Sequence, residues 1–422
     1  MATIIGAGQR YDRIIGVGGI STSIDGYVWS SESAITEPFP PRMKAQGIAV
    51  NGDGNVFVAI SDNGHAAYST DLQTWNDVRL LDSDFTALGI SWGTNGGSRP
   101  IFAIAGSRIY NDDNVLPGEY ADTNQIAQIL INETGNNYPW DQAFTHPETG
   151  SWFHNVRYFT GISINGITTN AWVAVGHVNG QPDIWYSENV NWTYGVSNVV
   201  VTAGGSTYNY ATVSIIGTTG EDATAEAVIG FPGVVAAINV INPGSRYDTV
   251  PNVVIFGDGF GADAYANIGP VGPPDPYTWQ RVTVPTAFAD RPLYDVQLYA
   301  GKLYFSGRGM VIYTDDMISG TWETSRFITT ERSKPDFLQL AINPDGHAVA
   351  VSSGGLIYSR DLEGWTLHSE LGYQFTSIAW FNDHWIAGAY SLLTKYTYFT
   401  STDGETWIPR NNGIQMYGMV SY

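Results

Sequence analysis

The chain contains no cysteine, and this absence limits how the protein can be stabilised. Disulfide bonds and thiolate metal sites are excluded, so stability must come from burial and hydrogen bonding. Lysine is scarce as well, with four residues among the 19 basic ones, while 40 acidic residues give a formal net charge of −21. An acidic surface repels phosphate groups, so we expect no binding to nucleic acid.

Charged residues and long apolar runs are also rare. Charged residues make up 14% of the chain, against 43% hydrophobic and 13% aromatic residues. No apolar run approaches the roughly 18 residues of a membrane-spanning helix, which predicts no membrane insertion. The N-terminus shows no signal-peptide pattern, so we expect synthesis in a cytoplasm. The 48 glycines and 14 tryptophans favour an all-β protein with many tight turns.

A short phrase returns four times: a Ser, an Asp two residues later, and a Trp four residues after the Asp. Its Asp and Trp residues are Asp25 and Trp29, Asp71 and Trp75, Asp361 and Trp365, and Asp403 and Trp407. Looser copies begin at Ser187 and Thr314. A phrase that recurs about every 40–50 residues among short apolar strands predicts a repeat fold of the β-propeller type.

The phrase is typical of structural residues. Its Asp can accept hydrogen bonds from the backbone N–H groups that follow it, and its Trp can fill the space between neighbouring sheets. A ligand site is normally built once, whereas this phrase recurs in most units. We therefore expect these residues to shape turns and not to bind a metal, a cofactor or a substrate.

Seven apolar runs are predicted to be the second strands of seven blades. These runs are Arg13–Gly18, Asn55–Ile60, Ile101–Ala105, Trp172–Gly176, Leu303–Gly307, Ala348–Ser352 and Trp385–Gly388. The first blade lacks a preceding strand, and Tyr417–Tyr422 is left over at the C-terminus. We predict that this C-terminal strand closes the ring in the first blade. In the third blade we expect a short helix at Asn124–Ile131.

A second, smaller β domain is predicted within the fourth blade. Val199–Tyr208 matches Ile238–Tyr247 at an offset of about 39 residues, which indicates an internal duplication. We place propeller blades at 1–195, the inserted domain at 196–275, and the remaining blades at 276–422. The start of the insertion stays open, because either Trp192 or Tyr277–Val282 could form the fourth strand of its blade.

The repeated phrase resembles the Asp-box (BNR) repeats of sialidase-like and photosystem-assembly-factor-like propellers. The inserted domain resembles duplicated modules in structural proteins of tailed bacteriophages, through Asn242–Tyr247, Pro251–Ile255 and Gly259–Ala264. The first resemblance implies a propeller fold and says little about activity. The second implies a virion protein.

Enzymatic chemistry finds little support in the sequence. A sialidase would need three converging arginines, a Tyr–Glu pair and an acidic Asp. Five arginines lie near blade strands, but none belongs to an Arg-Ile-Pro phrase: Arg13, Arg108, Arg157, Arg291 and Arg308. The seven histidines show no metal-ligand spacing, although folding could bring His154 and His177 together. We expect no enzyme activity, no cofactor and no catalytic residue.

The functional hypothesis is therefore a structural or accessory virion protein, such as a fibre, a baseplate part or a capsid decoration. Its partners would be other virion proteins, with a cell-surface glycan as a further partner, and copies of the chain could form a homo-oligomer. Two alternatives stay open: a glycan-binding propeller, and a cellular scaffold that resembles assembly factors. The expected location is the virion, after synthesis in the host cytoplasm.

Overall fold

The chain folds into two compact units in the computed structural model. The described residues are 2–10, 18–30, 36–39, 43–61, 64–80, 85–94, 100–109, 125–132, 140–188, 192–217, 222–244, 247, 249–274, 278–289, 291–327, 337–352, 355–368, 373–391 and 396–421. One unit joins Met1–Asn189 to Tyr277–Tyr422, and the other is Val190–Pro276. Regular structure in the described residues is β-strand, apart from one short 3₁₀ helix, η4 (Thr286–Phe288).

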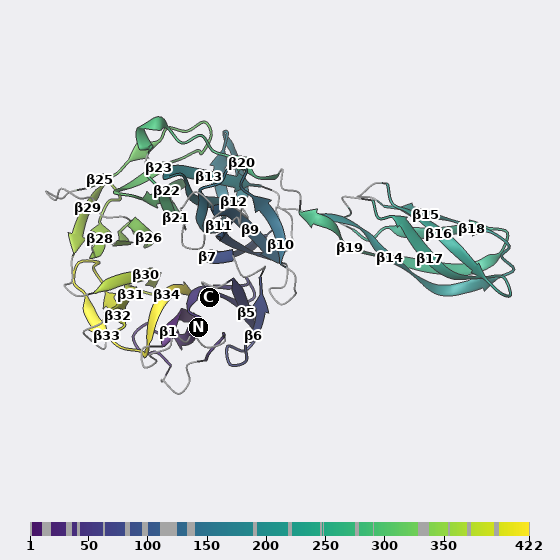
Figure 1. Cartoon of the computed structure of the whole chain (residues 1–422), viewed down its shortest axis with the longest axis horizontal. Helices are drawn as coiled ribbons and strands as arrows, with labels where there is room; N and C mark the ends of the chain where they lie inside the picture. Colours follow the sequence, from purple (N-terminus) through teal and green to yellow (C-terminus); the bar gives the residue numbers. More distant parts are fainter. Residues whose placement is uncertain are drawn as a thin grey trace, which may run out of the picture. The chain divides into compact units, whose positions relative to one another are not determined.

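The larger unit is a ring of seven sheets, each running from an inner to an outer strand (Figure 1). Blade 1 contains β34 (Ile414–Ser421), β1 (Ile4–Arg10) and β2 (Gly18–Ser23), and blade 2 contains β3 (Ala45–Val50), β4 (Phe57–Ser61), β5 (His65–Ser69) and β6 (Asn76–Arg79). Blade 3 contains β7 (Phe85–Thr94), β8 (Pro100–Ile109), β9 (Gln125–Asn132) and β10 (Asp141–Thr145). Blade 4 contains β11 (Ser151–Ile164), β12 (Ile167–Val178), β13 (Gln181–Ser187) and β20 (Gln280–Arg281). Blade 5 contains β21 (Leu293–Tyr299), β22 (Lys302–Gly307), β23 (Met310–Thr314) and β24 (Glu323–Thr324). Blade 6 contains β26 (Phe337–Ile342), β27 (Ala348–Ser352), β28 (Gly355–Ser359), β29 (Gly364–His368) and β25 (Arg326–Phe327). Blade 7 contains β30 (Gln374–Phe381), β31 (His384–Tyr390), β32 (Tyr398–Ser401) and β33 (Ile408–Arg410). The predicted all-β, seven-bladed propeller is confirmed.

The hydrophobic core of the propeller is divided among the spaces between blades. One cluster joins blades 2 and 3 through Val58 and Phe102, and another joins blades 4 and 5 through Val173 and Phe305. Every residue of β4 and of β27 is buried, because the middle strands are covered on both faces. Strands buried on both faces read as continuous apolar runs, which is why they are visible in the sequence.

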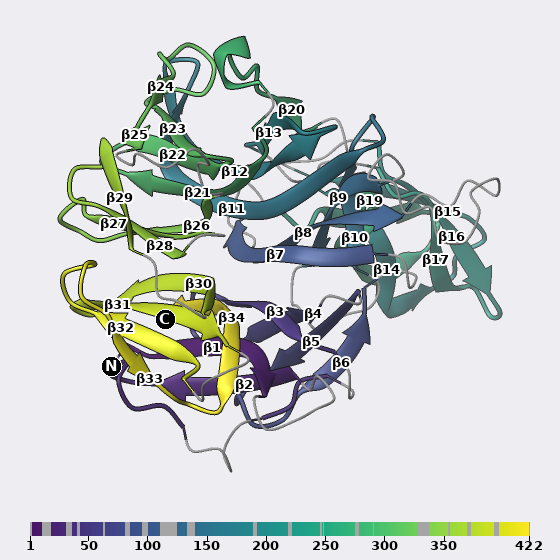
Figure 2. The ribbon, with the colours of Figure 1, turned by 60° about the vertical axis from the view of Figure 1, so that its left-hand side comes forward.

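The C-terminal strand closes the ring, as predicted (Figure 2). Strand β34 pairs antiparallel with β1, with Ile4 opposite Ser421, and β1 pairs on its other side with β2. Of the second strand predicted at Arg13–Gly18, residues 13–17 lie outside the described residues; β1 holds the place of the second strand, and Gly18 begins the third. The glycines of β1 read as turn residues, but a Cβ at Gly8 would stand 1.8 Å from the Gln415 carbonyl oxygen. Close approach between the strands therefore requires a glycine there.

The third blade differs from the prediction as well. The segment expected to be a helix at Asn124–Ile131 is largely strand β9, which pairs with β8 and β10. Six consecutive residues of β9 are buried, so the alternation typical of a half-buried strand is missing from the sequence. In this blade the sequence Tyr110–Asp112 also predicts the end of a third strand, and these residues lie outside the described part of the chain.

The smaller unit is a closed six-stranded barrel. Around the barrel the strands are β14 (Trp192–Ser206), β17 (Val234–Asn242), β16 (Thr224–Gly230), β15 (Ala211–Ile216), β18 (Asn252–Gly257) and β19 (Phe260–Pro274). Strand β14 begins at Trp192, before residue 196, and β20 supplies the fourth strand of blade 4. Tyr208 and Tyr247, which the duplication aligns, are buried in two separate clusters of the barrel.

Ring closure leads to a first prediction. Deleting residues 414–422 removes the inner strand of blade 1 and exposes the edge of β1, so the melting temperature should fall sharply or the protein should become insoluble. Circular dichroism of the deletion variant measures this change. A chain extended by a Gly/Ser tail after Tyr422 is the control and should melt like the native protein. Unchanged stability of the deletion variant would contradict closure by this strand.

Candidate functional site

Each inner strand of the propeller contains a β-bulge at an equivalent position, and β11 has a second irregularity between Phe159 and Ile162. In each strand one residue is skipped in the pairing with the second strand, so that two residues oppose one. The seven skipped residues, in blade order, are Tyr417, Gln46, Leu88, His154, Tyr294, Leu338 and Thr376. All seven line one cavity of about 550 Å³ at the centre of the ring. The bulges therefore build the central cavity.

The residue after each bulge contacts the neighbouring blade. In blades 1, 2 and 3 it is a glycine: Gly418, Gly47 and Gly89. A Cβ on Gly418 would lie 2.8 Å from the Cα of Gly47, and a Cβ on Gly89 would lie 2.8 Å from the Cα of Asn155. The inner strands of blades 1 and 2, and those of blades 3 and 4, approach so closely that no side chain fits between them, while a Cβ on Gly47 would lie 3.3 Å from the Ile90 side chain of blade 3.

In blades 4 to 7 the equivalent residue is polar and hydrogen-bonds across the gap between blades. These residues are Asn155, Asp295, Gln339 and Ser377. The Ile378 N–H donates to the Gln339 side-chain oxygen over 2.9 Å, and the Ser377 hydroxyl donates to the Met416 carbonyl over 2.9 Å. Side-chain hydrogen bonds thus replace direct backbone contact on this side of the ring.

Asp295 is the most heavily bonded of these residues. Its side chain is 1% exposed and lies 3.0 Å from the Arg157 Nε atom, in a pair with a half-buried guanidinium. The carboxylate also accepts hydrogen bonds from the Asn155 amide at 2.7 Å, and from the backbone N–H groups of Val296 at 2.8 Å and Leu340 at 3.0 Å. One buried carboxylate therefore ties together blades 4, 5 and 6, and its charge is fully compensated.

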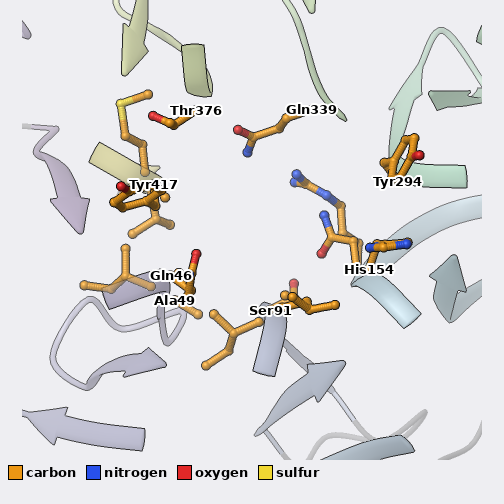
Figure 3. Close-up of a pocket in the computed structure, with 18 of the residues that line it drawn as sticks. Gln46, Ala49, Ser91, His154, Tyr294, Gln339, Thr376 and Tyr417 are labelled. Carbon is orange, nitrogen blue, oxygen red and sulfur yellow. The ribbon is translucent and has the colours of Figure 1, made fainter. Parts of the chain in front are cut away.

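The cavity has two unlike walls. Figure 3 shows His154 and Tyr294 on one side, facing Tyr417 and Thr376 on the other. Apolar and glycine residues of blades 1 to 3 form much of the lining, while blades 4 to 7 contribute mostly polar side chains. Arg157 is the one charged residue that lines the cavity in the described part of the chain, and it is paired with Asp295.

His154 and His177 are brought together by folding, as the sequence analysis suggested. The His154 Nε2 atom lies 3.1 Å from the His177 Nδ1 atom, and the ring of Tyr294 lies 4.9 Å from that of His154. Burial, with a smaller contribution from the charge of His177, lowers the pKa of His154 to about 3. The His154 side chain is therefore neutral at physiological pH and adds no charge to the cavity.

The repeated Asp residues lie far from the cavity, in the turns between third and fourth strands. Asp25 accepts from the Tyr27 and Val28 N–H groups at 2.8 and 2.7 Å. Asp71, Asp361 and Asp403 each accept from two backbone N–H groups at 2.7 to 2.9 Å. These bonds lower the pKa values of Asp25, Asp71 and Asp361. The carboxylates are occupied by their own turns.

The Trp of each phrase packs against the preceding blade. Trp29 joins the cluster between blades 7 and 1, and Trp365 the cluster between blades 5 and 6. Trp407 lies between blades 6 and 7, and the half-buried Trp75 packs between blades 1 and 2. Each phrase therefore fixes a turn in its own blade and fills the space beside the preceding blade.

The looser copies of the phrase behave differently. Asp316 accepts from the Ile318 and Ser319 N–H groups and also from Asn165 and Gly166 in the β11–β12 hairpin of blade 4. Burial opposes ionisation, but these hydrogen bonds outweigh it and hold the pKa of Asp316 well below the ordinary value. This turn is thus a contact between two blades. The copy that begins at Ser187 extends into residues outside the described part.

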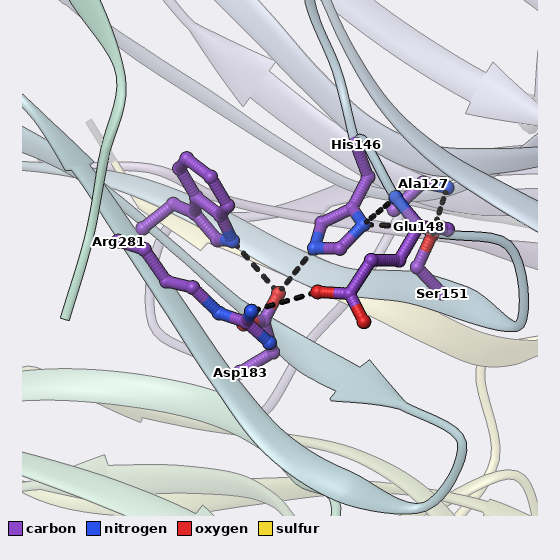
Figure 4. Close-up of polar contacts among 7 residues, drawn as sticks. Ala127, His146, Glu148, Ser151, Asp183 and Arg281 are labelled. Carbon is purple, nitrogen blue, oxygen red and sulfur yellow. Dashed lines mark hydrogen bonds and ion pairs between the residues drawn. The ribbon is translucent and has the colours of Figure 1, made fainter. Parts of the chain in front are cut away.

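A second polar cluster lies between blades 3 and 4 (Figure 4). The buried Asp183 carboxylate lies 3.1 Å from the His146 Nε2 atom and 2.7 Å from the Arg281 Nε atom. The His146 Nδ1 atom accepts from the Glu148 N–H at 3.0 Å, so a neutral His146 can carry its proton on the side of Asp183. No hydroxyl in this cluster is bonded to His146 among the described contacts, so the cluster lacks a nucleophile–base pair. It attaches β20, which follows the barrel, to blade 3.

Metal and membrane sites are not found in the described residues. No group of three or more His, Asp or Glu residues is placed to hold a metal ion in this part of the chain. No helix among the same residues is long and apolar enough to cross a membrane. Of the five arginines considered for a sialidase, only Arg157 lines the central cavity, and Arg13 lies outside the described residues.

Of the cavity residues, only His154 and Arg157 stood out in the sequence, although a signal for the others was present. A four-residue pattern recurs: an apolar residue, the cavity residue, a glycine or polar residue, and an apolar residue. Its seven copies are Ala45–Ile48, Ala87–Ile90, Phe153–Val156, Leu293–Val296, Phe337–Leu340, Phe375–Ile378 and Met416–Met419. The pattern is short and tolerates many residue types, so it is visible only when the inner strands are aligned.

Comparison with known proteins does not define a family. No family model and no curated protein matches the chain. Among solved structures, it is similar to "YCF48 bound to D1 peptide", with 12% identity, a TM-score of 0.42, and coverage of 88% of this chain and 83% of that one. It is also similar to Sqt1 of Saccharomyces cerevisiae, with 8% identity, a TM-score of 0.45, and coverage of 97% and 86%. Likenesses at this level say nothing about function.

The turn carboxylates lead to a second prediction. Burial disfavours the charged form of Asp403, but hydrogen bonds from the Thr406 and Glu405 N–H groups outweigh it and lower the pKa to about 2. Asp403→Ala should therefore reduce the free energy of unfolding by about 1–2 kcal/mol, with allowance for the exposure of this residue. Urea denaturation at pH 7 measures the loss.

The same turns predict how stability depends on pH. Because the folded pKa values of Asp25, Asp71, Asp361 and Asp403 lie below the ordinary value of 3.8, their contribution is complete above about pH 4. It should be lost as the pH falls through the folded pKa values, toward about 2 for Asp403. At low pH the native protein and Asp403→Ala should converge in stability. A difference that stays constant down to pH 2 would contradict this role.

The buried carboxylate leads to a third prediction. Asp295→Ala leaves Arg157 and the Leu340 N–H without their acceptor, so the free energy of unfolding should fall by about 3–5 kcal/mol. The exposed ion pair between Arg360 and Glu405 is the matched control, and Glu405→Ala should cost at most about 1 kcal/mol. Equal costs for the two variants would show that the buried carboxylate does not hold the blades together.

Proposed function

We propose that the protein is a non-enzymatic structural or accessory component of a virion, which docks on other virion proteins through the end of its barrel unit. The observation that carries this proposal is the distribution of exposed apolar side chains. Nine of the sixteen exposed large apolar side chains among the described residues belong to the barrel unit, which is about a fifth of the chain. Exposed apolar side chains at this density mark interaction surfaces.

Four of these side chains lie at one end of the barrel, opposite the end where the chain enters and leaves. Their exposed fractions are 100% for Phe231, 69% for Phe260, 60% for Tyr210 and 56% for Phe256. This set is called the barrel tip. Trp192 is paired with Pro274 at one end of β14, whereas Ser206 is paired with Phe260 at the other. The barrel tip is therefore the free end of the unit.

The barrel tip is held in shape by polar contacts. The Asn209 and Tyr210 N–H groups donate to the Asp258 carboxylate at 2.9 and 3.2 Å, and the Tyr208 N–H donates to the Gly233 carbonyl at 2.9 Å. A preorganised aromatic surface loses little conformational entropy on binding. The acidic chain favours a partner whose binding pocket is apolar with a basic rim.

The non-enzymatic part of the proposal is supported by the state of the carboxylates. The repeated Asp residues are bonded within their turns, and Asp295 is buried and fully bonded. Glycoside hydrolysis normally needs two carboxyl groups that face the substrate. The described lining of the central cavity contains no Asp and no Glu. The virion part is supported by the resemblance of the duplicated barrel module to tailed-phage structural proteins.

The test compares variants of the barrel tip in particles. Phe231→Ser combined with Phe260→Ser should lower incorporation into purified virions at least tenfold, measured by quantitative mass spectrometry, because it removes the two most exposed aromatic side chains of the barrel tip. Ile167→Ser is the matched control, since Ile167 is 66% exposed on the propeller unit. Circular dichroism verifies that each variant is folded.

Three outcomes would contradict the proposal. Absence of the native protein from purified virions would exclude the virion role. Equal incorporation of the double variant and the control would remove the barrel tip as the docking surface. Hydrolysis of a sialoside or another glycan by the purified protein, abolished by a substitution that leaves folding intact, would overturn the non-enzymatic reading.

A further inference from the structure

The central cavity differs from the rest of the protein in its chemistry. The chain as a whole carries a net charge of −21, yet the described lining residues include no acid. The one cation, Arg157, is half-buried and paired with Asp295. Since His154 is neutral as well, the cavity surface carries almost no net charge. A ligand that brings a formal charge would find no unpaired opposite charge there.

Several polar groups of the lining have hydrogen-bonding capacity left. The Gln339 side-chain oxygen is used by the Ile378 N–H, but its amide nitrogen has no acceptor among the described residues. The Gln46 amide makes no hydrogen bond within the described part of the chain, and the Ser91 hydroxyl has only a long contact of 3.5 Å to the Trp92 carbonyl. These groups lie around the cavity in Figure 3. Together they can donate to and accept from neutral hydroxyl groups.

Part of the lining is apolar. Ile48, Ile90, Met419 and Val420 contribute to it, beside the glycines that let blades 1 to 3 approach one another. The aromatic rings of Tyr294 and Tyr417 stand at two bulges on opposite sides of the cavity. The cavity therefore offers apolar and aromatic surface together with uncharged donors and acceptors.

We propose that the central cavity is a binding site for a neutral saccharide. A sugar ring has an apolar C–H face, which packs on aromatic and aliphatic side chains, and a rim of uncharged hydroxyl groups that donate and accept hydrogen bonds. The cavity offers both kinds of surface in one lining. Its volume of about 550 Å³ is within the usual range of small-molecule sites, about 300–1,000 Å³.

This site is separate from the barrel tip, so it does not depend on the proposed docking function. Its residues belong to the inner strands of the seven blades, and the bulges hold them in place. The residues that maintain the ring, such as Asp295 and Ser377, are already bonded to neighbouring blades. Gln46 and Ser91 can therefore be substituted without breaking a bond between blades.

The test measures binding of the full chain to glucose, galactose, N-acetylglucosamine, lactose and maltose by saturation-transfer NMR and calorimetry. At least one neutral sugar should bind. Gln46→Leu, which removes an uncommitted amide, and Ser91→Phe, which fills the cavity, should each weaken binding at least about tenfold. Gln73→Leu is the matched control, because Gln73 is exposed on a turn of blade 2 and should leave binding unchanged.

Sialyllactose and a neutral Asn/Gln/Ser-containing tripeptide are included as competing ligand classes. Binding of a neutral sugar that both cavity variants weaken would support the proposal. No binding of any neutral sugar would overturn it, as would binding that neither variant changes. Preferential binding of sialyllactose or of the tripeptide would assign the cavity to another ligand class. Loss of virion incorporation in the barrel-tip variant leaves these results unaffected, so the two proposals fail independently.

Discussion

The convergence of seven inner strands on one axis is the constraint on which the rest of the propeller depends. Near the centre, adjacent strands have little space between them, so the residue that faces the neighbouring blade must be small or must bond across the gap. Gly47, Gly89 and Gly418 satisfy the first condition, because any Cβ would meet another residue. Asp295 and Gln339 satisfy the second through hydrogen bonds to the next blade. The bulges turn the preceding residue of each strand into the cavity.

The outer part of the ring is stabilised in a different way. There the blades diverge, and large side chains fill the wider space, as Trp365 and Trp407 do between blades 5, 6 and 7. The turn that precedes each Trp is fixed by a carboxylate that accepts backbone N–H groups, as Asp403 does from Glu405 and Thr406. A wedge-shaped blade thus needs small or polar residues at its inner edge and aromatic residues at its outer edge. The repeated phrase supplies only the outer half of this requirement.

Much of the fold could be predicted because its strongest signals are local. Asp403 and Trp407 lie four residues apart and act within one turn, so their spacing survives in the sequence. Strand β1 was missed because glycines are typical of turns, whereas here Gly8 lies against the Gln415 backbone of β34 and Gly6 against the Met416 side chain. Strand β9 was mistaken for a helix because it is buried on both faces and lacks alternation. In both cases a distant strand decides the structure, and a short sequence window does not contain that information.

The cavity shows the same limit more strongly. His154 and Tyr294 are 140 residues apart in sequence, yet their rings lie 4.9 Å apart, because equivalent bulges of adjacent blades face the same axis. Only the hydrogen bonds distinguish the residues that maintain the ring from the residues that are free to bind a ligand. Asp295 and Ser377 are committed to neighbouring blades, whereas Gln46 keeps its amide for the cavity. In blades 4 to 7 the side chain after the bulge bonds to a neighbouring blade, while the residue at each bulge lines the cavity, so one backbone irregularity, repeated seven times, both joins the blades and supplies cavity residues.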